Sequence, residues 1–468
     1  MGAGKTTLGA GLAERIGRPF VDLDAELEAR ARLPVRELFA QRGEAEFRTL
    51  ESAAAVDVLE SRRPGVVALG GGAVKIEAVR RALREHALTL LLEVEPEVAW
   101  ERVRTAEDRP LARDPERFRA LHAERAPLYD ETADIRVRDL DGAVLAAAGV
   151  HVETGAFERL AELVPGEGPV ALVSEPRVAG IHGAEAQLAL GARLDSTHEL
   201  PSGEAAKGIA ACAALWEELG LERGGTLVAL GGGALTDAAG FVAATYLRGI
   251  AWAPVPTTLV GQVDAAIGGK TAIDVAAGKN LVGAFHWPAR VVADPALLAS
   301  LSPEERRNGL AEVVKTGLLA GAPLWELPDP DLVRACAAHK AAVCLRDPLD
   351  RGPRASLNLG HTFAHALEAG AGYALAHGDA VALGLTAALR VSERLYGLDP
   401  EIRADVERTL RPRPVAVDGA RAWAALRRDK KALGGEMRLV LLEAPGRPRT
   451  GVAVAEEDVR AELRALIT

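Results

Sequence analysis

A glycine-rich turn in the middle of the chain constrains the fold more than any other feature. Gly231, Gly232 and Gly233 follow the apolar run at 227–230, and Ala234-Leu235-Thr236-Asp237 come after them. A strand, a glycine turn and a helix together form a pyrophosphate site, because the free N–H groups at the helix start face the anion. Three glycines alone are weak evidence, so the surrounding residues decide the interpretation.

Strand-like and helical segments alternate through most of the chain. Strand-like runs occupy 19–23, 66–69 and 89–93, and a second series occupies 170–174, 226–230 and 250–255. From about residue 302 the pattern is mainly helical. Such alternation is typical of parallel sheets covered by helices. We therefore predict an α/β fold with three domains, at 1–142, 143–300 and 301–468.

Composition limits the class of protein. With 468 residues the chain is too long for one ordinary core. No apolar run is long enough for a bilayer and no signal peptide is evident, so we expect a cytoplasmic protein without membrane contact. A net charge of -10 argues against nucleic acid as a partner. Three cysteines without a CxxC pair indicate a reducing compartment and no thiolate metal site.

Polar motifs surround the glycine turn on both sides. Upstream, Glu204 and Lys207 lie three residues apart, on one face of an expected helix. Downstream, a dense series of hydroxyl, amine, amide and carboxylate side chains is improbable as simple structure. It comprises Thr257, Thr258, Asp264, Lys270, Lys279 and Asn280.

A second cluster, from 309 to 379, resembles a metal site. Glu312 and Lys315 are three apart, His361 and His365 are four apart, and His377 follows. One carboxylate with two imidazoles leaves coordination positions open for substrate oxygens, which suits a catalytic Zn²⁺. A single such histidine would more often be a buried structural residue, but three of the ten histidines fall within seventeen residues.

The chain opens with Met1-Gly2-Ala3-Gly4-Lys5-Thr6-Thr7, which is most of a phosphate-binding loop. Its backbone amides would hold phosphates, Lys5 would reach the terminal phosphates, and Thr6 would hold Mg²⁺. The triplet Gly4-Lys5-Thr6 alone fits a glycine-rich helix start equally well. Further motifs follow at Asp22-Leu23-Asp24, Glu46-Phe47-Arg48, Gly70-Gly71-Gly72, Arg109-Pro110-Leu111 and Arg125-Ala126-Pro127-Leu128-Tyr129.

In this order and spacing, the N-terminal motifs resemble shikimate kinase over nearly all of residues 1–141. The resemblance implies that shikimate binds to Asp24, Arg48, Gly71 and Arg125, although surface ion pairs are the alternative for the two arginines. It implies that ATP binds to Gly2, Gly4, Lys5, Thr6, Thr7 and the lid residue Arg109. Asp22 would help Thr6 to position Mg²⁺.

The later motifs together resemble 3-dehydroquinate synthase from about 150 to 442. The resemblance implies a Zn²⁺ (or Co²⁺) site at Glu312, His361 and His377. It implies an NAD site at Gly231, Gly232, Gly233, Asp237, Thr257, Thr258, Glu204 and Lys207. The substrate would contact Asp264, Lys270, Lys279, Asn280, Lys315, Arg354, Asn358, His365 and Lys430 (or Lys431). Arg248 would reach the active site of a partner subunit, which implies a homodimer.

Both families act on small acids. A 3-dehydroquinate synthase converts 3-deoxy-D-arabino-heptulosonate 7-phosphate to 3-dehydroquinate, with phosphate elimination and transient reduction of NAD⁺. A shikimate kinase transfers phosphate from ATP to shikimate. Lysine usage agrees with such anionic ligands, because seven of only nine lysines in this arginine-rich chain fall within the motifs. An amine and a guanidinium are not interchangeable at a tight site.

The sequence departs from the family patterns at several points. The kinase family has a strand and one further glycine ahead of the position of Met1, so we expect that the start codon was assigned too late. If Met1 is the true start, the kinase lacks a central strand. Its usual last helix also looks absent after 135–137. Thr236 replaces a usual glycine, and Glu175 stands where Asp usually meets the adenine ribose.

Three alternatives remain open on the sequence. A polyol dehydrogenase of the same fold would share the glycine turn and the metal cluster, but it usually has Asp as first ligand and lacks the anion-binding Lys and Asn set. A related sugar-phosphate cyclase would alter the carboxylate-binding positions. The kinase half could instead be a non-catalytic scaffold or dimer tether.

Overall fold

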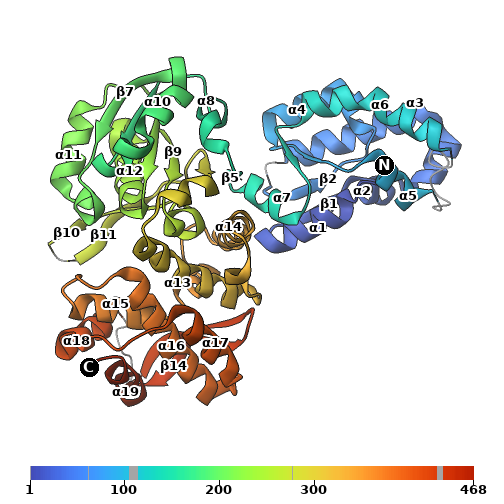
Figure 1. Ribbon diagram of the computed structural model, residues 1–468. Coiled ribbons are helices and arrows are strands. Elements are labelled where there is room, and N and C mark those ends of the chain that lie inside the picture. Colours follow the sequence, from blue (N-terminus) through green and yellow to red (C-terminus); the bar gives the residue numbers. More distant parts are fainter. Residues whose placement is uncertain (1, 62, 105–113, 277, 430–435) are drawn as a thin grey trace. The chain divides into compact units, whose positions relative to one another are not determined.

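The chain forms two compact units, and each is described by itself. The computed structural model describes residues 2–61, 63–104, 114–276, 278–429 and 436–468 (Figure 1). The expected site residues Arg109, Lys430 and Lys431 lie outside these ranges. The units are Met1–Ala148 and Gly149–Thr468. Both are of the α/β class, as the sequence predicts.

The N-terminal unit alternates short strands with helices. Its strands are β1 (Phe20–Asp22), β2 (Val66–Ala68), β3 (Leu90–Leu92) and β4 (Ile135–Val137). Its helices are α1 (Lys5–Ile16), α2 (Leu23–Ala31), α3 (Val35–Glu60), α4 (Glu77–His86), α5 (Pro96–Val103), α6 (Pro115–Thr132) and α7 (Leu140–Ala147), with the turn η1 (Ala73–Lys75).

The four strands of this unit form two separate parallel pairs. β1 pairs with β2, and β3 pairs with β4. Among the described residues no strand joins β2 to β3. A cavity of about 600 Å³ lies there instead, lined by β2, by β3 and by apolar side chains of α1, among them Leu8 and Leu12. Parallel strands normally pair on both edges and are buried on both faces. This cavity between β2 and β3, which we call the slot, therefore has the surroundings of an interior strand.

Helix α7 corrects one expectation. The last helix that seemed absent after residue 137 is present as α7, and only two residues separate it from β4. It packs on α1, where Arg15 and Asp141 form an ion pair of 2.5 Å. Asp139 caps it by accepting a hydrogen bond from Gly142 N. The domain division expected between residues 142 and 143 falls inside this helix.

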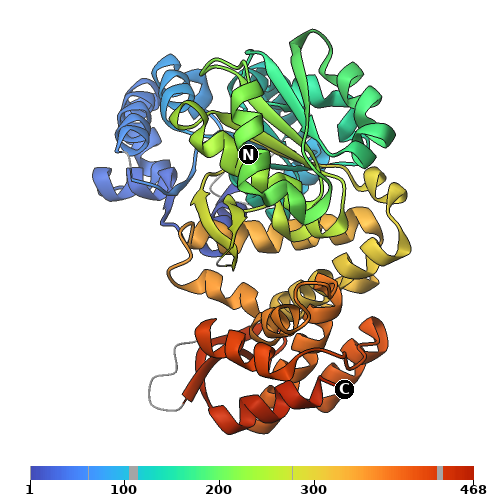
Figure 2. The ribbon, with the colours of Figure 1, turned by 90° about the vertical axis from the view of Figure 1, so that its left-hand side faces the viewer.

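The C-terminal unit begins with an α/β part and continues into a mainly helical part (Figures 1 and 2). Its strands are β5 (Val150–Val152), β6 (Val170–Ser174), β7 (Leu194–Glu199), β8 (Thr226–Gly231), β9 (Ala251–Pro256), β10 (Lys270–Val275), β11 (Gly278–Phe285), β12 (Val291–Ala293), β13 (Glu436–Ala444) and β14 (Arg447–Ala455). Its longer helices are α10 (Ala184–Leu190), α11 (Ile209–Glu218), α12 (Gly233–Thr245), α13 (Pro303–Ala320), α14 (Asp329–Arg346), α15 (His361–Gly370), α16 (His377–Tyr396), α17 (Pro400–Leu410), α18 (Gly419–Asp429) and α19 (Glu456–Ala465). Short helical segments are η3 (Ala156–Arg159), α8 (Leu160–Leu163), α9 (Pro176–Val178), η4 (Ala179–Gly183), η5 (Gly191–Arg193), η6 (Gly203–Lys207), η7 (Tyr246–Arg248), η8 (Gly261–Ala265), η9 (Pro295–Ser300), η10 (Leu324–Glu326) and η11 (Pro353–Asn358).

The main sheet places the glycine turn at its carboxyl edge. Its four parallel strands have the order β7-β6-β8-β9. Every residue of β8 is buried, as in an interior strand with helices on both faces. Apolar clusters fill both sides, one with α11 and α12 and the other with α10 and η3. Ligands of such sheets bind beyond the carboxyl ends of the strands, which is where Gly231 ends β8.

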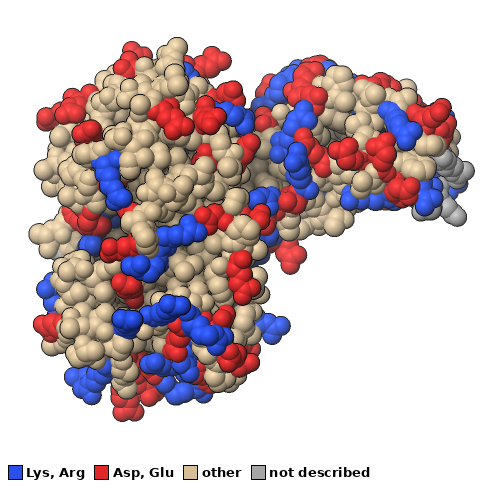
Figure 3. Space-filling model, viewed as in Figure 1, with Lys and Arg blue, Asp and Glu red and all other residues tan. Residues whose placement is uncertain are grey.

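The helical part carries the histidines. Helix α13 begins with a capping box in which Ser302 and Glu305 exchange hydrogen bonds, and it ends at Gly321 with a left-handed φ of 78°. Helices α13, α15 and α16 share an apolar core with the hairpin β13–β14. The described helices include none that is both long and apolar enough to span a bilayer. On the face drawn in Figure 3, acidic and basic side chains are interspersed.

Candidate active sites

The glycine turn brings α12 close to β8. A Cβ at Gly231 would lie 2.9 Å from the side chain of Leu235, and one at Gly233 would lie 3.1 Å from Ala265. Only glycine avoids these contacts. A cavity of about 350 Å³ opens beside the turn, and its lining includes Glu175, Ser202, Gly232, Gly233, Thr257 and Thr258. Backbone N–H groups at the start of α12 thus face a space that suits an anion.

The two sequence departures fit this cavity. Glu175 follows β6 directly, and its carboxylate accepts a hydrogen bond of 3.1 Å from Gly203 N. Thr236 is fully buried, and its hydroxyl donates to Gly233 O at 2.9 Å. The Thr236 hydroxyl therefore has its hydrogen-bond partner within α12, and it leaves no unpaired polar group at the turn.

A charged cluster lies on the neighbouring part of α12. Lys207 donates to Asp237 at 2.8 Å and also contacts the side-chain oxygen of Asn280. Lys279 lies 3.2 Å from Glu204, which is 4.0 Å from Lys207. The structure therefore brings together residues that the resemblance divides between the cofactor and the substrate.

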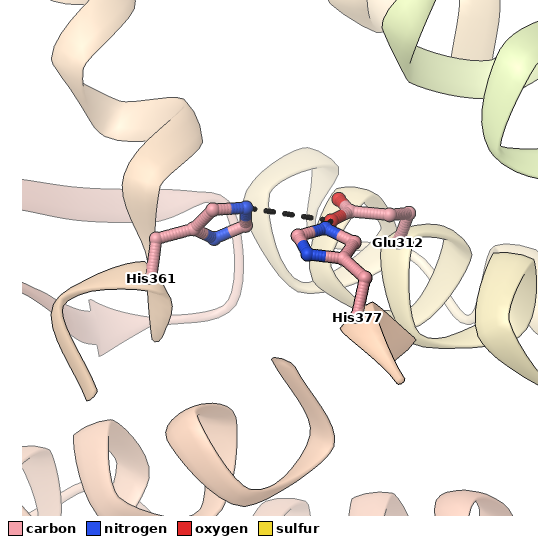
Figure 4. A group of neighbouring side chains, drawn as sticks. All are labelled: Glu312, His361 and His377. Atoms are coloured by element: carbon pink, nitrogen blue, oxygen red, sulfur yellow. Dashed lines mark hydrogen bonds and ion pairs between the residues drawn. The ribbon is translucent and has the colours of Figure 1, made fainter. Parts of the chain in front are cut away.

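The three expected metal ligands converge from three helices (Figure 4). Glu312 comes from α13, His361 from the start of α15 and His377 from the start of α16. The Nε2 atoms of His361 and His377 lie 3.4 and 3.1 Å from the same atom, Glu312 Oε1. The three ligand atoms lie within 4.8 Å of one another. This spacing suits one cation between them.

The chemistry of this group also suits a divalent cation. Glu312 is fully buried, which is costly for a carboxylate without strong partners. Burial lowers the pKa of His377, but hydrogen bonds with Glu312 and Glu368 outweigh it and raise the pKa to about 10. A cation that binds Nε2 would replace the proton held there and would compensate the same carboxylate.

Two lysines and Asp264 extend the buried network beyond Glu312. Lys315 contacts Glu312 and lies 3.8 Å from Asp264 Oδ2, and Lys340 contacts the other oxygen of Asp264. The Lys315 side chain is only 2% exposed. The sequence analysis missed Lys340, which lies on α14. The rarity of lysine in this chain was a usable signal for it. Eight of the nine lysines, the seven counted before plus Lys340, now belong to motifs or to this network.

Asp264→Asn should destabilise the C-terminal unit. Removing one partner of a buried ion pair costs about 3–5 kcal/mol, because the remaining charges stay buried. Burial raises the pKa of Asp264, but Lys315 and Lys340 lower it below its ordinary value of 3.8. The carboxylate therefore adds stability above pH 3.8 that is lost as the pH falls through the lower folded pKa.

Urea unfolding of parent and variant, followed between pH 7 and pH 3, measures this effect. We expect the difference in unfolding free energy to be largest at pH 7 and to shrink below pH 4. Asp350→Asn is the matched control, since Asp350 pairs with the half-exposed Lys270 at 2.5 Å and exposed pairs contribute about 0–1 kcal/mol. Equal effects of the two substitutions would contradict the buried network.

The other expected substrate residues differ from one another in how exposed they are. Arg354 is buried and donates to Gly268 O at 2.9 Å and to Pro348 O at 3.1 Å. His365 is exposed, and its ring lies 5.5 Å from that of His361. Asn358 ends η11 just before α15. Arg248 lies in the exposed turn η7 with a positive φ of 67°; its expected role in a partner subunit stays a prediction.

The phosphate loop of the N-terminal unit leads directly into α1. Gly4, with a φ of 93°, is the N-cap residue of α1, and Lys5 is its first helical residue. Gly2 also has a left-handed φ, and a Cβ there would meet Ala99 O at 2.2 Å. Thr6 donates to Asp22 Oδ2 at 2.7 Å, so the two expected Mg²⁺-positioning side chains touch. Thr7 is exposed in the same first turn.

The expected shikimate residues gather around a buried carboxylate that the sequence analysis missed. Glu51 is 1% exposed and pairs with Arg48 at 2.6 Å. Burial raises the pKa of Glu51, an effect that Arg48 opposes, and Asp24 and Arg125 also act on it electrostatically. Arg125 lines the large cavity together with Gly71 and is buried. Tyr129 donates to Gly71 O at 2.7 Å.

Comparison with known proteins accounts for nearly the whole chain. Residues 1–149 match the family model of shikimate kinase, 197–308 that of the 3-dehydroquinate synthase N-terminal part, and 309–432 that of its C-terminal part. A bifunctional shikimate kinase/3-dehydroquinate synthase of Thermotoga maritima is 33% identical over 485 residues, covering 96% of this chain and 95% of that relative. The chain belongs to this bifunctional family.

Relatives of the synthase half alone agree with this membership. A 3-dehydroquinate synthase of Gloeobacter violaceus is 42% identical over 346 residues, covering 68% of this chain and 96% of that relative. Among solved structures, 2-deoxy-scyllo-inosose synthase, in complex with carbaglucose-6-phosphate, NAD⁺ and Co²⁺, has a TM-score of 0.62 at 24% identity. It covers 68% of this chain and 96% of its own, and it shows the shared fold.

Proposed function

We propose that the C-terminal unit of this family member is a 3-dehydroquinate synthase that uses NAD⁺ and a divalent cation, Zn²⁺ or Co²⁺. The observation that carries the proposal is the convergence of two imidazole Nε2 atoms on one buried carboxylate oxygen, in the same unit as a glycine turn with an anion-sized cavity. NAD contacts would come from 143–300 and the cation ligands from 301–468. When bound, NAD⁺ would take and return one hydride, and the cation would polarise the hydroxyl being oxidised.

The residues of the chain bind and orient an anionic substrate. Lys315, Lys340 and Asp264 form a buried array beside the cation ligands, with Arg354 in the same part of the unit. Cationic side chains in a dry site hold carboxylate and phosphate strongly, because little water screens them. Lys270, Lys279, Asn280, Asn358 and His365 would complete the contacts to the substrate hydroxyl groups and phosphate, together with Lys430 or Lys431. Arg248 would contribute from a second subunit of a homodimer.

Substrate comparison tests this assignment against its rivals. We expect phosphate release from 3-deoxy-D-arabino-heptulosonate 7-phosphate and at least about 100-fold lower kcat/KM for a heptose 7-phosphate without the carboxylate, since buried cationic groups would then stay unpaired. A related cyclase that acts on sugar phosphates without a carboxylate would show the reverse preference. A polyol dehydrogenase would release no phosphate from either compound.

We propose that the N-terminal unit is a shikimate kinase. The observation that carries this proposal is the contact of Thr6, at the start of α1, with Asp22, in the same unit as the buried Glu51 and Arg125 and the half-buried Arg48. Lys5 and the helix N-terminus would hold the phosphates of ATP, with Mg²⁺ at Thr6 and Asp22. Asp24, Arg48, Gly71 and Arg125 would hold shikimate, with Arg109 over the nucleotide. Steady-state ADP release with shikimate tests this assignment.

The slot between β2 and β3 supports a second candidate for this half, a non-catalytic unit. A Val- and Ile-rich hexapeptide followed by one glycine, fused ahead of Met1, should pair with both strand edges. We expect it to raise the melting temperature of the N-terminal unit by several degrees and to raise shikimate-dependent ADP release by at least tenfold. Burial of roughly six apolar side chains, each worth about 1.5–3 kcal/mol when fully buried, accounts for the expected increase in stability.

A Ser- and Gly-rich extension of the same length is the matched control, because it can reach the slot but buries little apolar area. Full activity without any extension would show that the slot does not limit the kinase. A stabilised unit that still fails to phosphorylate shikimate would favour the non-catalytic candidate.

A further inference from the structure

A second carboxylate lies behind the expected cation site. Glu368 lies on α15, seven residues after His361, which places both on one face of the helix. Its side chain is 14% exposed, and its Oε1 lies 3.2 Å from Nδ1 of His377. The other ring nitrogen of His377 points to Glu312. The imidazole of His377 is thus held between two carboxylates.

The partner of His361 is different. Its Nδ1 lies 3.2 Å from the backbone oxygen of Leu359. A carbonyl and a carboxylate can only accept hydrogen bonds, so each of these contacts uses Nδ1–H as the donor and leaves Nε2 as the ring atom that faces Glu312. One ring is held by a neutral, fixed group of the backbone, and the other by a charged side chain.

The different partners have a physical consequence for the two ligands. A carboxylate behind a ligating histidine fixes the tautomer and the ring orientation and makes the ligating nitrogen a stronger donor. Each histidine is the first residue of its helix, but the side chain of His377 is 40% exposed whereas that of His361 is 11% exposed, so packing restrains His377 less. Glu368 supplies the restraint that His377 otherwise lacks.

We propose that Glu368 is the positioning residue of the cation site, and that it sets the cation affinity by holding His377. This inference rests on the proposed cation site at Glu312, His361 and His377. Glu368 reaches the cation through the His377 ring, so its role lies in affinity and ligand geometry, and it is not a catalytic residue.

Zn²⁺ and Co²⁺ titrations of the full chain test the inference. We expect Glu368→Ala to weaken Zn²⁺ binding about 10- to 100-fold, measured by competition with a chromophoric chelator. Glu368→Gln keeps an acceptor oxygen without the charge and should fall between parent and alanine variant. The visible spectrum of the Co²⁺-loaded protein should change in the alanine variant, since a loosened His377 alters the ligand field.

Glu162→Gln is the matched control, because Glu162 pairs with Arg159 on an exposed surface, and its Zn²⁺ affinity should equal that of the parent. A Zn²⁺ affinity of Glu368→Ala within threefold of the parent, with an unchanged Co²⁺ spectrum, would overturn the inference. A lower melting temperature without a change in affinity would do the same, as it would reveal a purely structural role. If the parent itself binds neither ion, the proposed cation site fails as a whole, which is a separate outcome.

Discussion

Glu312→Gln lowers phosphate release from 3-deoxy-D-arabino-heptulosonate 7-phosphate by at least about 1,000-fold. The carboxylate is fully buried, and both histidine Nε2 atoms lie within 3.4 Å of its Oε1. A neutral amide is a weaker ligand for a divalent cation, and loss of cation polarisation removes several kcal/mol of transition-state stabilisation, with each 1.36 kcal/mol worth a factor of ten. Initial rates of phosphate release at saturating Zn²⁺ measure the effect.

The kinase activity of the same chain is an internal control for Glu312→Gln. Kinase activity should remain at the parent level, because the N-terminal unit is compact by itself. Lys315 loses its closest partner in the variant, so circular dichroism must first show that the C-terminal unit is folded. A folded variant with parental phosphate release would contradict the assignment of Glu312 as a cation ligand.

Lys5→Ala lowers ATP-dependent phosphorylation of shikimate by at least about 100-fold. Lys5 starts α1 at the expected phosphate site, and removal of one charge-stabilising donor from a transferring group costs about 100- to 1,000-fold in kcat. Shikimate-dependent ADP release measures this in the strand-extended chain, where the slot cannot limit the parent rate.

Phosphate release by the synthase half should be unchanged in Lys5→Ala. Lys75→Ala is the matched lysine control, since Lys75 pairs with Glu124 at 2.8 Å on an exposed surface, and it should keep parental kinase activity. Loss of both activities in Lys5→Ala would show that the two halves depend on each other.

The sequence predicts strands with a continuous apolar run well, and strands of mixed polarity and short helices poorly. Strand β8 is an unbroken apolar run because helices cover both faces, and such a run is visible without a structure. Strand β7 (Leu194–Glu199) was missed because it alternates half-buried with exposed residues and has no continuous apolar run, whereas β9, at the other end of the strand order, is almost entirely buried and was predicted. Helix α7 was missed because only eight residues form it, and its packing on α1 is a tertiary contact.

The candidate sites were likewise predicted from the sequence only in part. The histidine cluster and the family resemblance predict Glu312, His361 and His377 as ligands, although the three residues come from three different helices. Lys340 stands alone in the sequence, and only the packing of α14 on η8 brings it to Asp264. Glu51 pairs locally with Arg48, three residues earlier on α3, but its burial depends on the packing of α3 against other elements. Contacts between distant segments are not encoded in local spacing.

Simultaneous recording of phosphate release and absorbance at 340 nm tests the central claim most directly. The purified chain receives 3-deoxy-D-arabino-heptulosonate 7-phosphate, catalytic NAD⁺ and Zn²⁺. We predict many turnovers of phosphate per NAD⁺ without net accumulation of NADH, because the hydride is returned within each cycle. Net accumulation of NADH, or the absence of phosphate release, would contradict the account.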